Sequence, residues 1–177
     1  PVHSVVLDDY YIGETEVTQE LWEMVMNENP STFIGKEHPV EHVSWEDCHL
    51  FITKLNERTG KKFRLPTEAE WEFAARGGNK SEGYVYSGSD SLECIAWYED
   101  NENKTTHPVK QKSPNELGLY DMTGNVWEWC SDYYDCYHYL KYPAYNPVNK
   151  DSGYNAYEIV SVYRGGSWGS SATKCRV

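Results

Sequence analysis

The second half of the chain lacks the three- and four-residue spacing of apolar residues that marks a helix. From about residue 78 to residue 177, short apolar runs such as 127–130 and 159–164 alternate with Gly, Asn, Asp and Pro. This punctuation predicts short strands held in long loops. Trp and Tyr are frequent in the same region, which disfavours disorder. The second half is therefore expected to consist of structured, functional or ion-stabilised loops.

Helices are predicted only in the first half of the chain. Thr18 is the expected N-cap of a helix that buries Leu21, Trp22 and Val25 and ends near residue 29. A second helix follows Ser44 and stops at Gly60. Residues 67–70 have the capping-box pattern that begins a third helix. A few helices followed by small strands in long loops define an α+β fold.

Length and charge narrow the possible partners. The 177 residues are enough for one domain with a core. There are 16 Lys and Arg against 28 Asp and Glu, which gives a formal net charge of −12. Because binding to phosphate backbones or anionic membrane surfaces needs a basic face, neither nucleic acid nor such a surface is an expected partner. No apolar stretch approaches the length of a membrane span.

The cysteines and the termini leave the cellular compartment open. Five cysteines are an odd number, so at least one thiol must be free or paired outside this chain. No targeting segment is visible, and Pro1 leads directly into a strand-like run at residues 2–7. We expect the sequence to begin inside a domain. The absence of a visible targeting segment therefore carries no information on localisation.

Five sequence blocks stand out, at residues 13–18 (GETEVT), 42–45 (HVSW), 64–72 (RLPTEAEWE), 118–129 (GLYDMTGNVWEW) and 164–168 (RGGSW). In this order they resemble the formylglycine-generating enzyme (sulfatase-modifying factor) family. The resemblance implies a C-type-lectin-like fold, in which a few helices lie beside small, twisted, mostly antiparallel sheets and a large surface is built from loops. It also predicts one domain over residues 1–177 that lacks the family's first strand and its C-terminal segment.

The resemblance also indicates which residues an enzyme of this family would need for catalysis. The oxidising members of the family bind copper with two cysteines near the C-terminus and convert a substrate cysteine to formylglycine. Counted from residues 165–168, the second of these positions is Cys175, and the first is Ser170. A hydroxyl is a poor ligand for Cu(I), so copper is not expected. Ser167 and Trp127 match positions that line the family's pocket, so the catalytic candidates would be Cys175, Ser167 and Trp127.

A calcium site is a better metal prediction. Asp121 and Glu128 lie seven residues apart and flank a glycine turn that can aim carbonyls inward, which suits a hard cation. By resemblance, the ligands are the side chains of Asp121 and Glu128 and the carbonyls of Gly124 and Val126, in a structural role. The alternative is an ordinary turn followed by a strand. Weaker metal candidates are two groups: His38, His42 and His49; and Cys130, Cys136 and His138.

The segment after Trp168 resembles the altered region of variable proteins from diversity-generating retroelements, which use the same fold for display. Its predicted ligand-binding residues are small or polar, and they alternate with Ala172 and Cys175, which together with Trp168 are expected to point inward. A solvated loop is the alternative explanation. With Trp127, the predicted binding residues are Trp168, Gly169, Ser170, Ser171, Thr173 and Lys174.

The leading functional hypothesis is a non-catalytic ligand-binding domain, with a protein or small-molecule ligand at the C-terminal loop face. The first alternative is a formylglycine-generating oxidase that acts on a cysteine of a protein substrate. The second is a structural component of a surface lipoprotein. The resemblance favours an extracytoplasmic or cell-surface location.

Overall fold

The three longer helices all lie in the first half of the chain, as expected. The computed structural model describes residues 4–101, 103–135, 144–151 and 160–177. The longer helices are α1 (Gln19–Met26), α2 (Trp45–Thr59) and α3 (Glu68–Ala75). The remaining described elements are short: η1 (Gly78–Lys80), α4 (Leu92–Ile95), β1 (Glu128–Tyr133), β2 (Ser161–Arg164) and η3 (Ala172–Lys174).

The helix termini confirm most of the local expectations. The Thr18 side chain accepts a hydrogen bond from the Leu21 N–H at the start of α1, and α2 and α3 both begin with complete capping boxes. Gly60 ends α2 in the left-handed conformation, with φ 68°.

The first helix is shorter than the sequence suggested. Asn27, with φ 63°, caps α1 directly after Met26, so the helix ends before Pro30 is reached. The expected apolar face is also wrong at one position, because Leu21 is exposed whereas Trp22 and Val25 are buried.

One two-stranded antiparallel sheet is present in the described ranges. Trp129 of β1 pairs with Tyr163 of β2, and the register shifts between Trp129 and Tyr133. The expected strands near residues 83–87 and 95–98 form only isolated bridges, Tyr86 with Ser89 and Trp97 with Gly124. Loops thus supply most of the framework around a small sheet, in agreement with the expected fold class.

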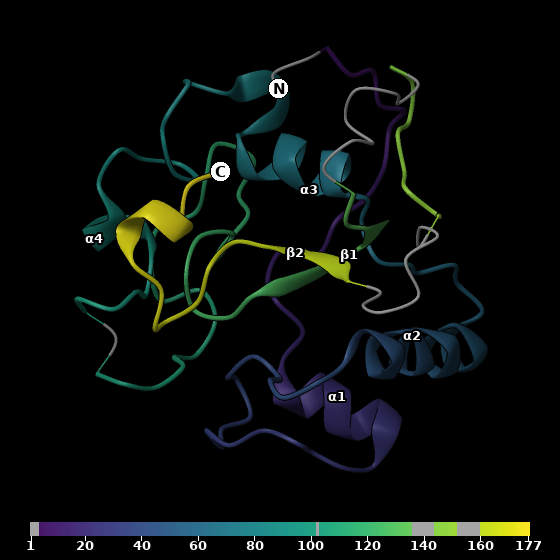
Figure 1. Cartoon of the computed structure of the whole chain (residues 1–177). Coiled ribbons are helices and arrows are strands. Elements are labelled where there is room, and N and C mark those ends of the chain that lie inside the picture. Colours follow the sequence, from purple (N-terminus) through teal and green to yellow (C-terminus); the bar gives the residue numbers. More distant parts are fainter. Residues whose placement is uncertain (1–3, 102, 136–143, 152–159) are drawn as a thin grey trace.

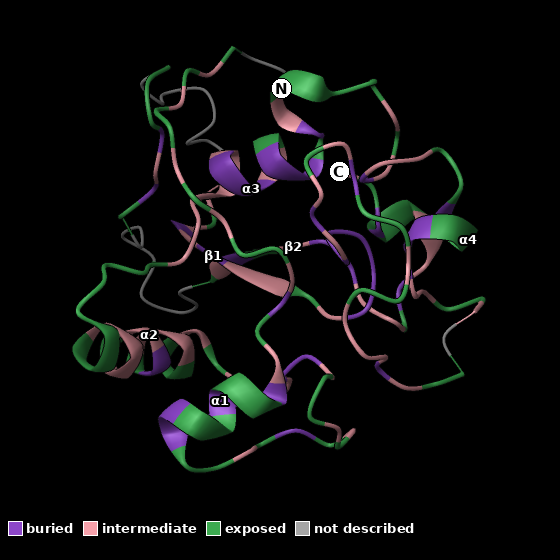
Figure 2. Ribbon diagram, turned by 180° about the vertical axis from the view of Figure 1, so that it is seen from behind, coloured by how far each residue is buried: buried purple, intermediate pink, exposed green. Residues whose placement is uncertain are grey.

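Three apolar clusters hold these elements together. Helix α3 lies over the sheet, α1 and α2 form a separate layer below it, and α4 lies beside the C-terminal segment (Figure 1). Figure 2 shows that buried residues occupy α3 and the loops that pass behind the sheet. The cluster under α3 contains Trp71, Ala74, Ala75, Leu119, Met122, Cys130 and Val162; the α1–α2 cluster Trp22, Val25, Met26, Val40 and Phe51; and the α4 cluster Leu92, Ile95, Ala96 and Cys175.

Buried amide side chains fix the loops where secondary structure is missing. The Asn115 amide nitrogen donates to the Ala74 carbonyl and the Ser87 hydroxyl, while its oxygen accepts from the Leu117 and Leu119 N–H groups. Such bonds replace ladder hydrogen bonds and satisfy buried backbone groups. Among the described helices, none has the length and apolar character to cross a bilayer.

Candidate functional site

The C-terminal segment leaves β2 through two glycines that need their unusual backbone. Gly165 and Gly166 have φ values of 95° and 82°, a region that L side chains rarely adopt. A Cβ at Gly166 would also lie 2.8 Å from the Cys175 sulfur. The segment can therefore fold back closely on itself.

The expected alternation of outward and inward residues is only partly correct. Gly169, Thr173 and Lys174 are exposed, Ser171 is half-buried and Cys175 is buried, which agrees with the expectation.

Ser170 is the first exception, since it is 5 % exposed. Its hydroxyl accepts a hydrogen bond from the Ser167 N–H and lies 3.1 Å from the Ser167 hydroxyl, while its carbonyl accepts from the Glu99 N–H. Ser170 thus closes a tight turn from the inside and contributes to the frame rather than to the outer surface.

Trp168 is the second exception, because it is half-buried rather than part of the core. Its backbone N–H donates to the Asn125 carbonyl, and its ring packs edge-on against Phe33, with ring centroids 5.6 Å apart. The indole is therefore held in place but remains accessible.

Substitutions at Lys174 and Ser170 should separate surface from frame. Lys174→Ala should change the free energy of unfolding by less than about 0.5 kcal/mol, as at other exposed sites. Ser170→Ala should cost about 1–3 kcal/mol because it leaves the half-buried Ser167 N–H without its acceptor. Urea denaturation of both variants measures the difference, and equal costs would show that the segment is not divided in this way.

An exposed aromatic pair lies on the sheet that leads into this segment. Trp127, directly before β1, meets Tyr163 of β2 edge-on with centroids 5.0 Å apart, and Tyr163 contacts Trp129 in the same manner. Trp127 and Tyr163 are 38 % and 47 % exposed. Tyr163 was missed by the sequence analysis, although it alternates with the buried Val162 and so could have been placed on the outer face. Trp127, Tyr163 and residues 168, 169, 171, 173 and 174, all exposed or half-buried, are here called the C-terminal loop face.

The residues at the expected copper positions do not suit copper. Burial, with the nearby charge of Glu99, raises the pKa of the Cys175 thiol to about 11, so it is protonated at neutral pH. The Cys175 sulfur lies 4.0 Å from the Ser170 carbonyl oxygen. The first of the two positions holds the Ser170 hydroxyl, which lies 3.1 Å from the Ser167 hydroxyl. One protonated thiol and one hydroxyl are a poor donor set for Cu(I).

The residues at the expected calcium positions come together in a buried, acidic loop. Asp121 is 3 % exposed with φ 58°; one carboxylate oxygen accepts from the Lys110 N–H, and the other has no hydrogen-bond partner among the described residues. Burial and the Asp121 charge raise the pKa of Glu128 to about 7, although the Trp71 indole acts in the opposite direction. An unpartnered buried oxygen beside a second carboxylate fits a calcium ion.

Glu16 is a further acid at this loop that the sequence analysis did not single out. Its carboxylate accepts hydrogen bonds from the Asn125 side chain and from the Val126 N–H. Burial raises its pKa well above the usual value, and the charges of Asp121 and Glu128 act in the same direction. Glu16 thus holds the peptide unit directly before the Val126 carbonyl, which is one of the expected ligands. The sequence block at residues 13–18 could have indicated a functional role for Glu16, but its partner Asn125 lies 109 residues away in the sequence.

The histidine metal candidates are not brought together in the described part of the chain. The His38 ring bonds to the Thr106 hydroxyl, and the His49 ring packs on Trp45. Cys136 and His138 lie outside the described residues. Within the ranges that are described, no three His, Cys, Asp or Glu side chains form a group able to hold a metal ion, so the calcium site would depend on backbone carbonyls as well.

Comparison with known proteins places this loop-rich fold in a family. The profile of the sulfatase-modifying factor enzyme 1-like domain matches residues 1–177. The chain belongs to the sulfatase-modifying factor family. This confirms the resemblance drawn from the five sequence blocks.

Two relatives with similar sequence identity to this chain are named for different activities, a chaperone and an enzyme. The chain is 39 % identical over 182 residues to chaperone protein LppX of Paenibacillus barcinonensis. This alignment covers 74 % of this chain and 65 % of LppX. It is also 39 % identical over 145 residues to the formylglycine-generating enzyme of Streptomyces coelicolor. This second alignment covers 74 % of this chain and 42 % of the enzyme. The chain thus spans less than two thirds of the length of both relatives.

A solved structure matches nearly the whole chain. Treponema denticola variable protein 1 superposes with a TM-score of 0.85 and 37 % identity, over 98 % of this chain and 78 % of that protein. A variable protein therefore shares the arrangement of helices, sheet and loops described above.

Proposed function

We propose that this chain is a non-catalytic ligand-binding domain that uses the C-terminal loop face to bind a protein or small molecule. The observation that carries the proposal is the match of 98 % of the chain to a variable protein. The face itself has the composition of an adaptable surface, since Trp127 and Tyr163 offer rigid aromatic area and residues 169–174 are small or polar.

The surrounding structure supports display on a rigid frame. Gly165, Gly166 and Ser170 hold the turn from inside, and Cys175 packs in the α4 cluster. Exposed residues on such a frame can change at little cost in stability. We therefore include Gly169, Ser171, Thr173, Lys174 and the half-buried Trp168 in the proposed site and assign Ser170 to the frame.

The finer proposal is that a diversity-generating retroelement alters this segment. The test is the neighbouring DNA, where we expect a reverse transcriptase gene and a near-copy of the sequence that encodes residues 168–175. The near-copy should differ from the gene mainly at adenines. A locus without either feature would contradict this proposal but would leave ligand binding at the face open.

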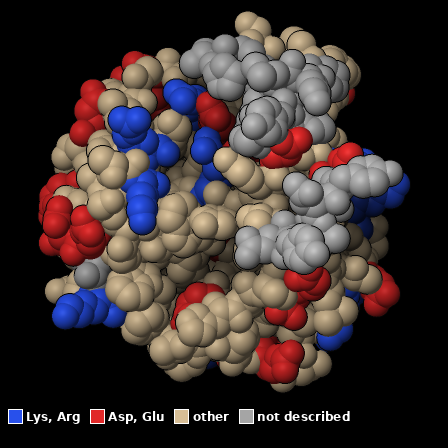
Figure 3. Space-filling model, in the orientation of Figure 1, with Lys and Arg blue, Asp and Glu red and all other residues tan. Residues whose placement is uncertain are grey.

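The proposal also covers the cellular location of the domain and the effect of its net charge on possible partners. We place the domain outside the cytoplasm or at the cell surface, and the match to LppX is compatible with this placement. Nucleic acid is not a proposed partner, given the formal charge of −12. Figure 3 nevertheless shows Lys and Arg side chains gathered in one area on the face of the molecule drawn in Figure 1, so the charge of the surface is uneven.

An oxidase is the function that the proposal excludes, and it can be tested directly. The purified domain, incubated with Cu(I), oxygen and a cysteine-containing sulfatase peptide, should yield no formylglycine by mass spectrometry. Ser170→Cys restores a pair of thiols and should bind Cu(I) more tightly than the unmodified domain. Formylglycine in the peptide treated with the unmodified domain would overturn the non-catalytic assignment.

A further inference from the structure

A small cavity lies between α1 and α2, at a part of the fold that the proposed function does not use. Its volume is about 170 Å³, below the roughly 300–1,000 Å³ of pockets that hold drug-sized ligands. It can therefore admit only a group of a few heavy atoms. The lining residues come from α1, the loop that follows it and the start of α2: Trp22, Met26, Glu28, Asn29, Pro30, Val43 and Asp47.

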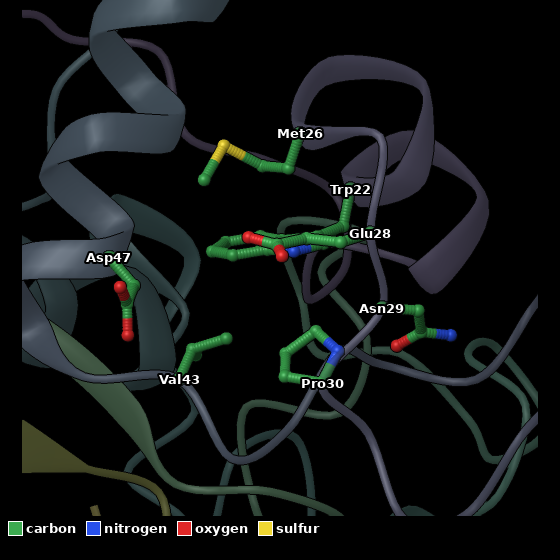
Figure 4. A pocket seen from close by; sticks show the side chains of 7 residues that line it. All are labelled: Trp22, Met26, Glu28, Asn29, Pro30, Val43 and Asp47. Atoms are coloured by element: carbon green, nitrogen blue, oxygen red, sulfur yellow. The ribbon is translucent and has the colours of Figure 1, made fainter.

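The centre of this cavity is an aromatic ring. Figure 4 shows the Trp22 indole with Met26 on one side of the ring plane and with Pro30 and Val43 on the other. Phe51 stacks on Trp22 with centroids 4.8 Å apart and an interplanar angle of 4°, so the ring cannot turn freely. Trp22 is 3 % exposed, and its N–H has no hydrogen-bond partner in the described part of the chain.

Two carboxylates lie at the rim. Asp47 accepts hydrogen bonds from the N–H and the hydroxyl of Ser44, and these bonds lower its pKa, so it is ionised at neutral pH. Glu28 is exposed and lines the cavity. No Lys or Arg is among the lining residues. The cavity thus combines an aromatic ring, apolar walls and two carboxylates.

We propose that this cavity binds the quaternary ammonium head group of a small organic cation. The indole is the aromatic ring that attracts cations best, and quaternary ammonium ions are the ligands most often recognised in this way. The methyl groups of such an ion can pack against Met26, Pro30 and Val43, which offer no acceptors for the N–H groups of a primary amine. The two carboxylates supply the complementary charge.

Choline and its neutral isostere 3,3-dimethyl-1-butanol provide matched probes. They have the same shape, but only choline is charged. We expect choline to bind with a dissociation constant of about 1 mM, as suits one small group in an open cavity, and to shift the Trp22 indole N–H resonance in the NMR spectrum. The neutral alcohol should bind at least about fivefold more weakly. Equal binding, or no shift of the Trp22 resonance with choline, would overturn the proposal.

Variants at exposed glutamates locate the charge without disturbing the core. Glu28→Gln should weaken choline binding about two- to fivefold, which is the contribution expected of an exposed ionic contact. Glu57→Gln removes an exposed carboxylate of α2 that does not line the cavity and should leave binding unchanged. Equal effects of the two substitutions would show that only the overall charge matters and would contradict the site.

A further measurement identifies the source of the head group. If the ligand is a free cation, the protein should stay in the supernatant when phosphatidylcholine vesicles are sedimented. Co-sedimentation that choline reverses would assign the head group to a lipid and overturn the free cation. Because the lining residues are not part of the C-terminal loop face, these results do not depend on the proposed function.

Discussion

Removal of calcium should lower the melting temperature of the domain by about 5–10 °C. A ligand present at about a hundred times its dissociation constant stabilises the folded state by about 2.7 kcal/mol, and each kcal/mol shifts the midpoint of a protein of this size by about 2–4 °C. The expectation rests on the buried Asp121 oxygen without a partner and on the neighbouring Glu128. Calorimetry with calcium and after chelation measures it.

The stability of the calcium-free protein should also depend on pH, in a known direction. Burial raises the pKa of Glu128 to about 7, and it raises the pKa values of Glu16 and Asp121 as well. A carboxyl whose pKa is raised by folding favours the folded state most below its ordinary pKa of about 4.5. That contribution is lost as the pH rises through about 7. Calcium favours the charged form, so it should reduce the loss.

Two conservative variants serve as controls for the calcium site. Glu128→Gln should remove the calcium response and weaken the pH dependence between pH 5 and pH 8. Glu46→Gln, at an exposed position in the first turn of α2, should keep both. Identical melting curves of the unmodified protein with and without calcium would contradict the site.

The parts of the fold that follow from short stretches of sequence were predictable. Capping boxes at Ser44 and Thr67 and the left-handed cap at Gly60 are determined by residues a few positions apart. The strand at Glu128–Tyr133 also lies where the apolar run indicated. The end of α1 was misplaced because Pro30 is a conspicuous stop signal, whereas the actual cap is Asn27.

The parts of the site that depend on distant contacts were not predictable from spacing. Ser170 seemed to be a surface residue because it is small and polar, yet its burial results from the turn with Ser167 and from the Glu99 N–H. Glu16 reaches the acidic loop from the other end of the chain. Small polar residues fit both a solvated loop and a buried hydrogen-bonded turn, so only the three-dimensional arrangement distinguishes the two.

The glycine of the acidic loop connects the candidate calcium site with the C-terminal loop face. The Gly124 N–H donates to the Gly165 carbonyl, and the next residue, Asn125, donates its N–H to the Trp97 carbonyl and accepts from the Trp168 N–H. The backbone at residues 124 and 125 therefore holds the start of the C-terminal segment in place. A change there should affect both sites together.

Gly124→Ala should destabilise the domain by about 3–5 kcal/mol, since it combines left-handed strain with overpacking. Gly124 has φ 84°, and an added Cβ would lie 2.2 Å from the Trp97 carbonyl oxygen, which is backbone and cannot rotate away. Gly118→Ala is the matched control, because Gly118 has φ 83° but no atom within 4 Å of the added Cβ. It should cost only the strain, about 1–2 kcal/mol. Urea denaturation compares the two variants, and NMR of the Trp127 and Trp168 indoles should show displacement of the face in Gly124→Ala alone. Equal costs in the two variants would mean that the Trp97 loop yields easily, and the acidic loop would then not be the rigid support of the face.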